Sequence, residues 1–113
     1  FDPEATTSRA FLSRLAGLVK YSLNQRHGQG QLSVLAAAMA QRELAVRIGL
    51  AWLEASGFLS ELSIQEDRVS FAAGRGIPQL ERKEALAVQL EAVLEESAAF
   101  RAYFRRVEAA LLL

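Results

Sequence analysis

The residues that could carry out catalysis are few, and their spacing does not suit it. His27 is the only histidine, which excludes a multi-histidine metal site and leaves one candidate base for a Ser-His-Asp arrangement. It stands between Arg26 and Gly28 in a segment rich in amides and glycine, where a solvated surface histidine is the simpler interpretation. The sequence therefore favours a domain without an active site of its own.

The acidic pairs and short glycine motifs add no chemistry. The adjacent glutamates at 95–96 would point about 100° apart on a helix, so their carboxylates do not converge. The Glu-Asp pair at 66–67 suits a hairpin turn. The glycines at 28–30 and 74–76 are too few for a dinucleotide fingerprint and lack the lysine of a phosphate loop. We therefore expect no metal, cofactor or small-molecule substrate in this chain.

One basic cluster is of a type that binds single-stranded nucleic acid. A tyrosine beside cations suits base stacking and contact with the phosphate backbone of a single strand. The cluster lies on the first expected helix and the loop that follows it, and consists of Arg14, Lys20, Tyr21, Gln25, Arg26 and His27. An ordinary solvated helix face has the same composition. Both interpretations stay open, and we favour the solvated face.

A second basic cluster suits an acidic protein partner. Arg101 and Arg105 are four residues apart and share a helix face, and Arg106 flanks them. Because arginine forms strong charge-assisted hydrogen bonds with carboxylates, these three residues predict a docking site for an acidic peptide. The same face would also suit packing against the rest of a larger protein. The acidic hairpin turn at 66–67 is a second surface that could dock a partner.

Apolar spacing predicts the elements that position these clusters. A helix should follow hydroxyl caps at Thr7 and Ser8 and end in the glycine-containing loop 24–30. A brief strand at 31–32 and a short helix at 34–40, capped by Ser33, come next. A third helix over about 41–56 should end at Gly57, with an apolar face made of Leu44, Ile48, Ala51, Trp52 and Ala55.

The second half of the chain changes period. Apolar and polar residues alternate on both sides of the turn at 66–67, which predicts a β-hairpin. Residues 72–79 make a connector, and 80–96 and 97–112 are helical, as one helix or two. We therefore predict a mainly α chain with a small β-hairpin: a winged-helix-like core over 1–79, with its wing at about 59–71, and a helical extension over 80–113 packed on it within a single domain.

Composition agrees with one soluble domain. The chain has 113 residues, of which 51% are hydrophobic and 23% charged, enough to bury one core. No apolar stretch reaches the length of a membrane span, and the absence of cysteine fits a cytoplasmic location. Residues 1–48 hold six basic and three acidic residues, a net charge of +3, and residues 49–113 hold seven and ten, a net charge of −3. This balance is weaker than that of an autonomous nucleic-acid binder.

Four segments in order carry a resemblance to a known family. They are the opening helix at 9–12 (RAFL), the Leu-x-x-Leu-Ala helix at 32–36, the apolar helix and turn at 50–59 and the tail helix at 94–101. Together they resemble the C-terminal domain of RecJ, the bacterial single-strand-specific 5′→3′ DNA exonuclease. The chain departs from the family at Ser56, where a leucine is usual, and at Phe100, where a tyrosine is usual.

The resemblance implies an accessory role in recombinational DNA repair. The appended domain would tune the nuclease or recruit partners, such as the acidic tail of a single-strand-binding protein or a DNA translocase. The nuclease chemistry of that family, which uses Mn²⁺ or Mg²⁺, belongs to Asp- and His-rich motifs that this sequence lacks.

The alternative is the DNA-binding domain of a transcriptional regulator. A helix that reads duplex DNA and its wing both need positive charge, because phosphate contacts supply much of the affinity. The third helix has only Arg42 and Arg47, opposed by Glu43 and Glu54, and the wing turn is acidic. Sequence-specific duplex binding is therefore disfavoured.

Overall fold

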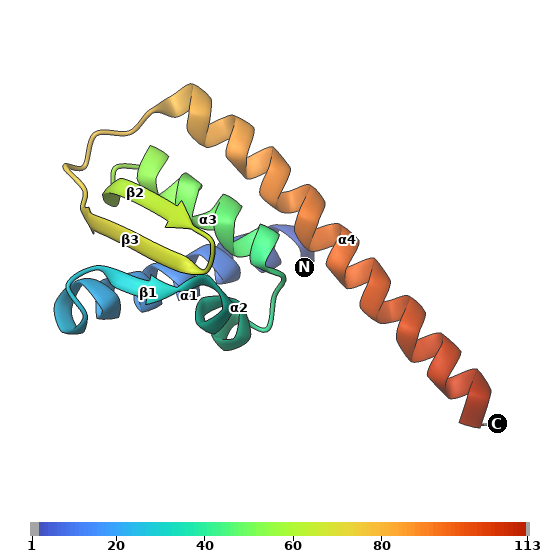
Figure 1. Cartoon of the computed structure of the whole chain (residues 1–113). Helices are drawn as coiled ribbons and strands as arrows, with labels where there is room; N and C mark the ends of the chain where they lie inside the picture. The colour runs from blue at the N-terminus through green and yellow to red at the C-terminus, as the bar shows by residue number, and fades with distance from the viewer. Residues whose placement is uncertain (1–2, 113) are drawn as a thin grey trace.

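This computed structural model consists of four helices and a small antiparallel sheet (Figure 1). The structure describes the backbone of residues 3–112 and the side chains of residues 8–96, 98, 99 and 106. The elements are α1 (Pro3–Gln25), β1 (Gln29–Gln31), α2 (Leu32–Met39), α3 (Glu43–Ala55), β2 (Leu59–Gln65), β3 (Arg68–Ala73) and α4 (Leu80–Leu112). The prediction of a mainly helical chain with a small β element is confirmed, although the hairpin gains a third strand.

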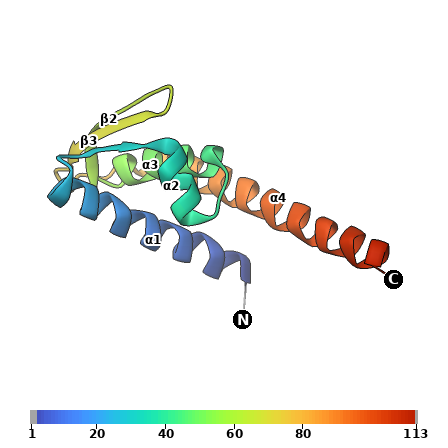
Figure 2. The same cartoon turned by 60° about the horizontal axis from the view of Figure 1, so that its bottom comes forward.

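Helix α1 begins earlier than its hydroxyl residues predict. It starts at Pro3, so Thr7 and Ser8 lie within the helix and the predicted cap is wrong. Proline suits a first helical position, since its fixed φ is already helical and its missing N–H would have no partner there. In Figure 2, α1 lies on one side of α2 and α3, and the hairpin of β2 and β3 lies on the other.

The sheet has the strand order β1-β3-β2, with both pairs antiparallel. On its inner side, Val69 and Phe71 of β3 are buried in the core. Six outward positions are polar and exposed: Gln29, Gln31, Ser63, Gln65, Arg68 and Ser70. The strand predicted at 31–32 forms at 29–31, and its pairing with β3 makes the hairpin into a sheet.

The hairpin turn is attached to the start of α2. Asp67 Oδ1 accepts a hydrogen bond from the Ser33 N–H (2.8 Å), and its Oδ2 accepts one from the Ser33 hydroxyl (2.7 Å). The Asp67 carbonyl accepts the Leu32 N–H (2.8 Å). The predicted capping by Ser33 is therefore wrong: α2 begins at Leu32, and the carbonyl and carboxylate of Asp67 satisfy the N–H groups of Leu32 and Ser33.

Helix α3 packs against α1, α2, β2 and α4. Because several elements cover it, its burial does not follow the single stripe predicted from sequence. Leu44, expected in the core, is 50% exposed, whereas Ala45, Val46 and Leu50 are fully buried.

Gly57 ends α3 as predicted. Its φ of 87° is left-handed, its N–H bonds to the Glu54 carbonyl (3.1 Å), and the next N–H, of Phe58, bonds to the Leu53 carbonyl (3.0 Å). This pair of bonds satisfies two of the carbonyls that the end of a helix leaves without partners.

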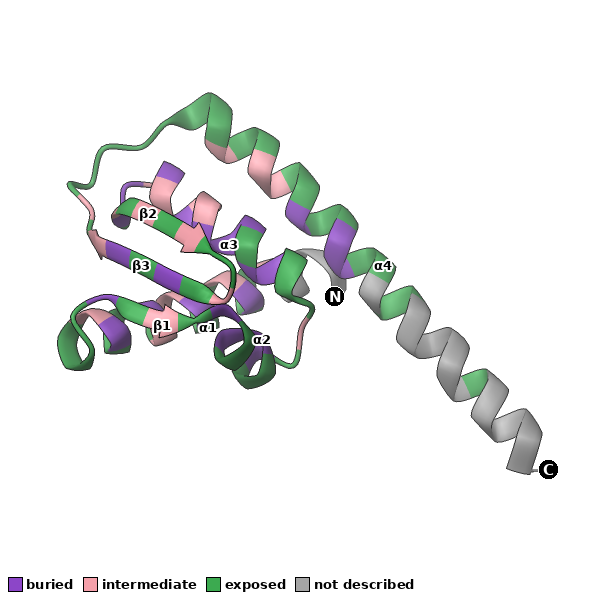
Figure 3. Ribbon diagram, in the orientation of Figure 1, coloured by how far each residue is buried: buried purple, intermediate pink, exposed green. Residues whose placement is uncertain are grey.

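Helix α4 is one continuous helix of 33 residues, which settles the choice between one helix and two. Leu90, Val93 and Leu94 are buried against the body of the protein, and Leu86 is half-buried. Figure 3 shows buried and half-buried parts of α4 where it runs beside α3. Beyond them the helix extends away from the other elements (Figure 1).

We predict that Gly49→Ala destabilises the protein by about 1–3 kcal/mol. A Cβ at Gly49 would lie 2.6 Å from Leu15 and 2.8 Å from Phe11, where α1 and α3 meet. Gly17→Ala is the control, because nothing lies within 4 Å of its Cβ position. In an exposed helix it should stabilise by up to about 1 kcal/mol. Urea denaturation measures both changes, and two changes of the same sign would contradict the close packing at Gly49.

We also predict that Asp67→Ala lowers the free energy of unfolding by about 1–2 kcal/mol, since α2 loses its capping carboxylate. Glu66→Ala removes the same charge from the same turn, but the exposed Glu66 side chain takes part in none of the hydrogen bonds or ion pairs found among the described side chains. It should leave stability within about 0.5 kcal/mol. Thermal unfolding followed by circular dichroism compares the two variants, and equal losses would remove the capping role of Asp67.

Candidate functional site

The basic cluster expected to bind a single strand is not brought together as one surface. All five residues proposed to bind it, Arg14, Lys20, Tyr21, Arg26 and His27, are exposed. Arg14 and Tyr21 share a face of α1, but seven residues separate them by about 10 Å along the axis. Lys20 points about 100° away from Tyr21. Arg26 and His27 lie in the loop after α1, and Arg26 belongs to a different surface.

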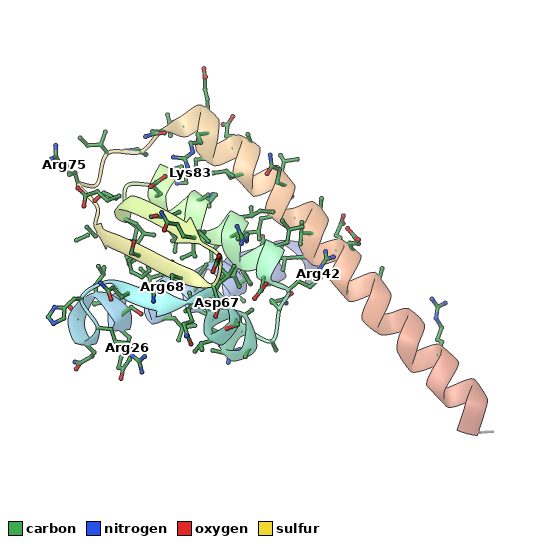
Figure 4. The ribbon with its side chains drawn as sticks, viewed as in Figure 1. Arg26, Arg42, Asp67, Arg68, Arg75 and Lys83 are labelled. Atoms are coloured by element: carbon green, nitrogen blue, oxygen red, sulfur yellow. The ribbon has the colours of Figure 1, made fainter. Side chains whose placement is uncertain are left out.

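That surface is the outward side of the sheet, which we call the polar sheet face. It holds a shallow cavity of about 660 Å³. Polar residues of the three strands line it, together with Gly30, Val69 and the side chain of Arg26 from the loop before β1. The strand residues are Gln29, Gln31, Ser63, Gln65, Arg68 and Ser70. Figure 4 shows Arg26 and Arg68 on either side of β1.

The sheet register arranges these side chains in two rows. Gln29, Ser70 and Ser63 are directly paired across the strands, and so are Gln31, Arg68 and Gln65. Neighbouring strands lie about 4.8 Å apart, and successive rows on one face are about 6.5–7 Å apart. Arg68 thus stands on the central strand between two glutamines.

The polar sheet face is positively charged. No carboxylate is among the residues that line it, and Asp67, the nearest acid along the chain to Arg68, is bound to the start of α2. Within the part of the chain that the structure describes, the ion pairs are Arg42–Glu96 and Arg82–Glu54. Arg26 and Arg68 therefore carry their charge on this face without a carboxylate partner among the described residues.

Sequence reasoning missed this surface. The alternation of polar residues in the hairpin is visible in the sequence, and so is Arg26. The pairing of β1 with β3 is not, because it joins residues about 40 positions apart. From the sequence alone, Gln29 falls in the predicted loop and Gln31 in a brief predicted strand with no assigned partner.

A second region lies where α4 packs on α3, the third helix of the chain. Glu54 of α3 accepts the Leu62 N–H of β2 through Oε2 (3.0 Å) and pairs with Arg82 of α4 through Oε1 (2.9 Å). Lys83 of α4 lies 4.8 Å above the Trp52 ring. Trp52 therefore contacts α4, and Glu54, two residues further along α3, contacts both β2 and α4.

Arg42, just before α3, is also held by α4. Its guanidinium donates to the Val93 carbonyl (3.4 Å) and lies 3.7 Å from the Glu96 carboxylate. Of the two arginines that the sequence offered for contact with duplex DNA, Arg42 is thus tied to α4, and Arg47 is exposed on α3.

The arginines predicted to bind a partner lie on the far part of α4. Arg106 is exposed, and the side chains of Arg101 and Arg105 lie outside the described residues. Among the described residues, no three histidine, aspartate or glutamate side chains are grouped so that they could hold a metal ion. No described helix combines the length and the apolar character that crossing a membrane requires.

Comparison with known proteins identifies no relative. No family model, no curated protein and no solved structure matches the chain. The resemblance to the RecJ C-terminal domain therefore stays a prediction from the sequence.

We predict that Leu90→Ala costs about 2–5 kcal/mol of stability, because Leu90 is only 1% exposed where α4 packs on the body. Val88→Ala, at a position 68% exposed on the same helix, should change stability by less than about 0.5 kcal/mol. Urea denaturation followed by Trp52 fluorescence also reports on the α3–α4 contact. Equal stability of Leu90→Ala and Val88→Ala would contradict the packing of Leu90 on the body of the protein.

Proposed function

We propose that this chain is a non-catalytic docking domain with winged-helix architecture, whose helix α4 forms an arm that presents arginines to an acidic protein partner. The order helix, strand, helix, helix, strand, strand and the sheet order β1-β3-β2 support the winged-helix assignment. Helix α4 is then an addition to that core.

The observation that carries the docking proposal is that α4 continues past its last described buried residues. Val93 and Leu94 are the last buried residues described on the helix, and the described side chains after them, Glu95, Glu96, Ala98, Ala99 and Arg106, are exposed. A helix of about 16 residues is marginal in water when nothing packs on it. A partner that covers this arm would stabilise it.

The charge of the arm favours an acidic partner. Arg101, Arg105 and Arg106 follow one another within about one and a half turns, and the guanidinium groups can each make paired hydrogen bonds with carboxylates. In the context of the RecJ resemblance, the domain would be an accessory part of a single-strand-specific DNA exonuclease. Its partner would be the acidic tail of a single-strand-binding protein or a DNA translocase of recombinational repair.

The alternative, a transcriptional regulator that reads duplex DNA with α3, is less well supported. Trp52 of α3 contacts α4, Glu54 contacts β2 and α4, and Arg42 bonds to α4. Insertion of this part of α3 into a major groove would require α4 to move, at the cost of the buried contacts of Leu90, Val93 and Leu94.

We predict that the full chain binds a fluorescent peptide with the acidic C-terminal sequence of a bacterial single-strand-binding protein. Replacing Arg101, Arg105 and Arg106 by glutamate should weaken this binding at least about tenfold, since each lost charge-assisted hydrogen bond costs about 1.5–3 kcal/mol and the new charges repel the peptide. Fluorescence anisotropy measures the Kd.

The matched control replaces Arg9, Arg14 and Arg75 by glutamate, which makes the same change in net charge at exposed positions away from the arm. This control should bind the peptide within about twofold of the original chain, apart from a salt-dependent long-range term. Equally weakened peptide binding in both variants would show that the effect depends on net charge and not on the arm. No binding by the original chain would exclude an acidic peptide of this kind as the partner.

A further inference from the structure

The polar sheet face has the composition of a binding surface with no ligand assigned to it. Its outward side chains are three glutamines, two serines and Arg68, and Arg26 borders them from the loop before β1. Amides, hydroxyls and guanidiniums all donate hydrogen bonds, and only the amides and hydroxyls accept them. The face therefore offers many donors, a charge of +2 and no acid.

The architecture keeps that charge uncompensated. The turn that joins β2 to β3 carries two acids, and Asp67 directly precedes Arg68. Its carboxylate is bound by the N–H and hydroxyl of Ser33 at the start of α2, so it is not available to pair with Arg68. Glu66, the other acid of the turn, is exposed and does not line the cavity.

The strands that carry these donors are also held in fixed positions. β3 is the central strand and is paired on both sides, so the backbone that carries Arg68 and Ser70 is ordered by two ladders. Gln31 and Gln65 flank Arg68, and Gln29 and Ser63 flank Ser70, at the strand spacing of about 4.8 Å. Binding would cost little backbone ordering.

We propose that the polar sheet face binds the phosphodiester backbone of single-stranded nucleic acid. Arg26 and Arg68 pair with phosphates, and the glutamines and serines donate to the remaining phosphate and sugar oxygens, which are the usual partners of such side chains. No aromatic side chain lines the face, so contact is made with the backbone and not by base stacking.

Two other ligands fit less well. Acidic peptide motifs are normally recognised by clusters of arginines, whereas only two of the nine lining residues are arginines and most of the donors are amides and hydroxyls. Duplex DNA is normally read by a helix or strand pair inserted in a groove, whereas this face is a shallow cavity across a three-stranded sheet. This inference does not use α4 and goes beyond the docking function.

The test measures binding of the full chain to a fluorescent oligothymidylate of about 20 nucleotides over a series of salt concentrations. Two phosphate contacts on a single strand predict that log Kobs falls with log salt with a slope of about −1.4. Arg26→Gln and Arg68→Gln should each weaken binding about tenfold at low salt and each make the slope shallower by about 0.7.

Arg47→Gln and Arg75→Gln are the matched controls, because both residues are exposed arginines outside the face. They should leave the affinity within about twofold and the slope unchanged. Circular dichroism checks that all four variants keep their fold. Arg14→Gln tests the basic cluster of α1 and should behave like the controls.

Four results would overturn the proposal. Unchanged binding by Arg68→Gln would exclude the face, and dependence on Arg14 in place of Arg68 would move the site to α1. Equal affinity for a duplex of the same length would remove the single-strand preference. If polyglutamate bound more tightly than the oligonucleotide, with the same dependence on Arg26 and Arg68, the ligand would be an acidic peptide. None of these outcomes depends on Arg101, Arg105 or Arg106.

Discussion

The hydrogen bonds between the hairpin turn and the start of α2 determine how the two halves of the small domain fit together. Asp67 binds Ser33 through its carboxylate and Leu32 through its carbonyl. Because β1 runs directly into α2, this attachment also holds β1 alongside β3. The three-stranded sheet, and with it the pairing of Gln29 and Gln31 with the hairpin, follows from a contact made at one end of that strand. The same contact occupies an acid that would otherwise stand beside Arg68.

A second carboxylate has a comparable role at the opposite end of the hairpin. Glu54 binds the backbone of β2 at Leu62, where the β2–β3 register shifts, and the guanidinium of Arg82 on α4. One side chain of α3 therefore links the sheet and the last helix. The Glu54 carboxylate is half-buried and binds two partners. Such a group stabilises the fold more than an exposed ion pair does, because it satisfies a backbone amide as well as a charge. Asp67 and Glu54 therefore both bind groups that hold the fold together, and neither lines the polar sheet face.

Local patterns in the sequence predicted local features well. Gly57 ends α3 because a left-handed residue is needed there, and the alternation around 66–67 makes a hairpin because the period of two is a property of the segment itself. The predictions that failed are those in which a residue distant in the sequence determines the local structure. Ser33 reads as a cap until Asp67, 34 positions away, takes that role. Leu44 reads as core because its spacing matches Ile48, but four neighbouring elements determine which sides of α3 are covered. The polar sheet face needed the β1–β3 register, which no short-range signal specifies.

The arm formed by α4 has a consequence for how two ligands could be held. From Glu95 to Arg106 the helix rises by about 17 Å, so a partner bound near Arg106 would sit clear of the body of the domain, which carries the polar sheet face. The two surfaces do not share a residue, and occupation of one would leave the other accessible. A protein held on the arm and a strand held on the sheet would then be tethered to one rigid spacer. Their local concentration relative to one another would be raised without any direct contact between them.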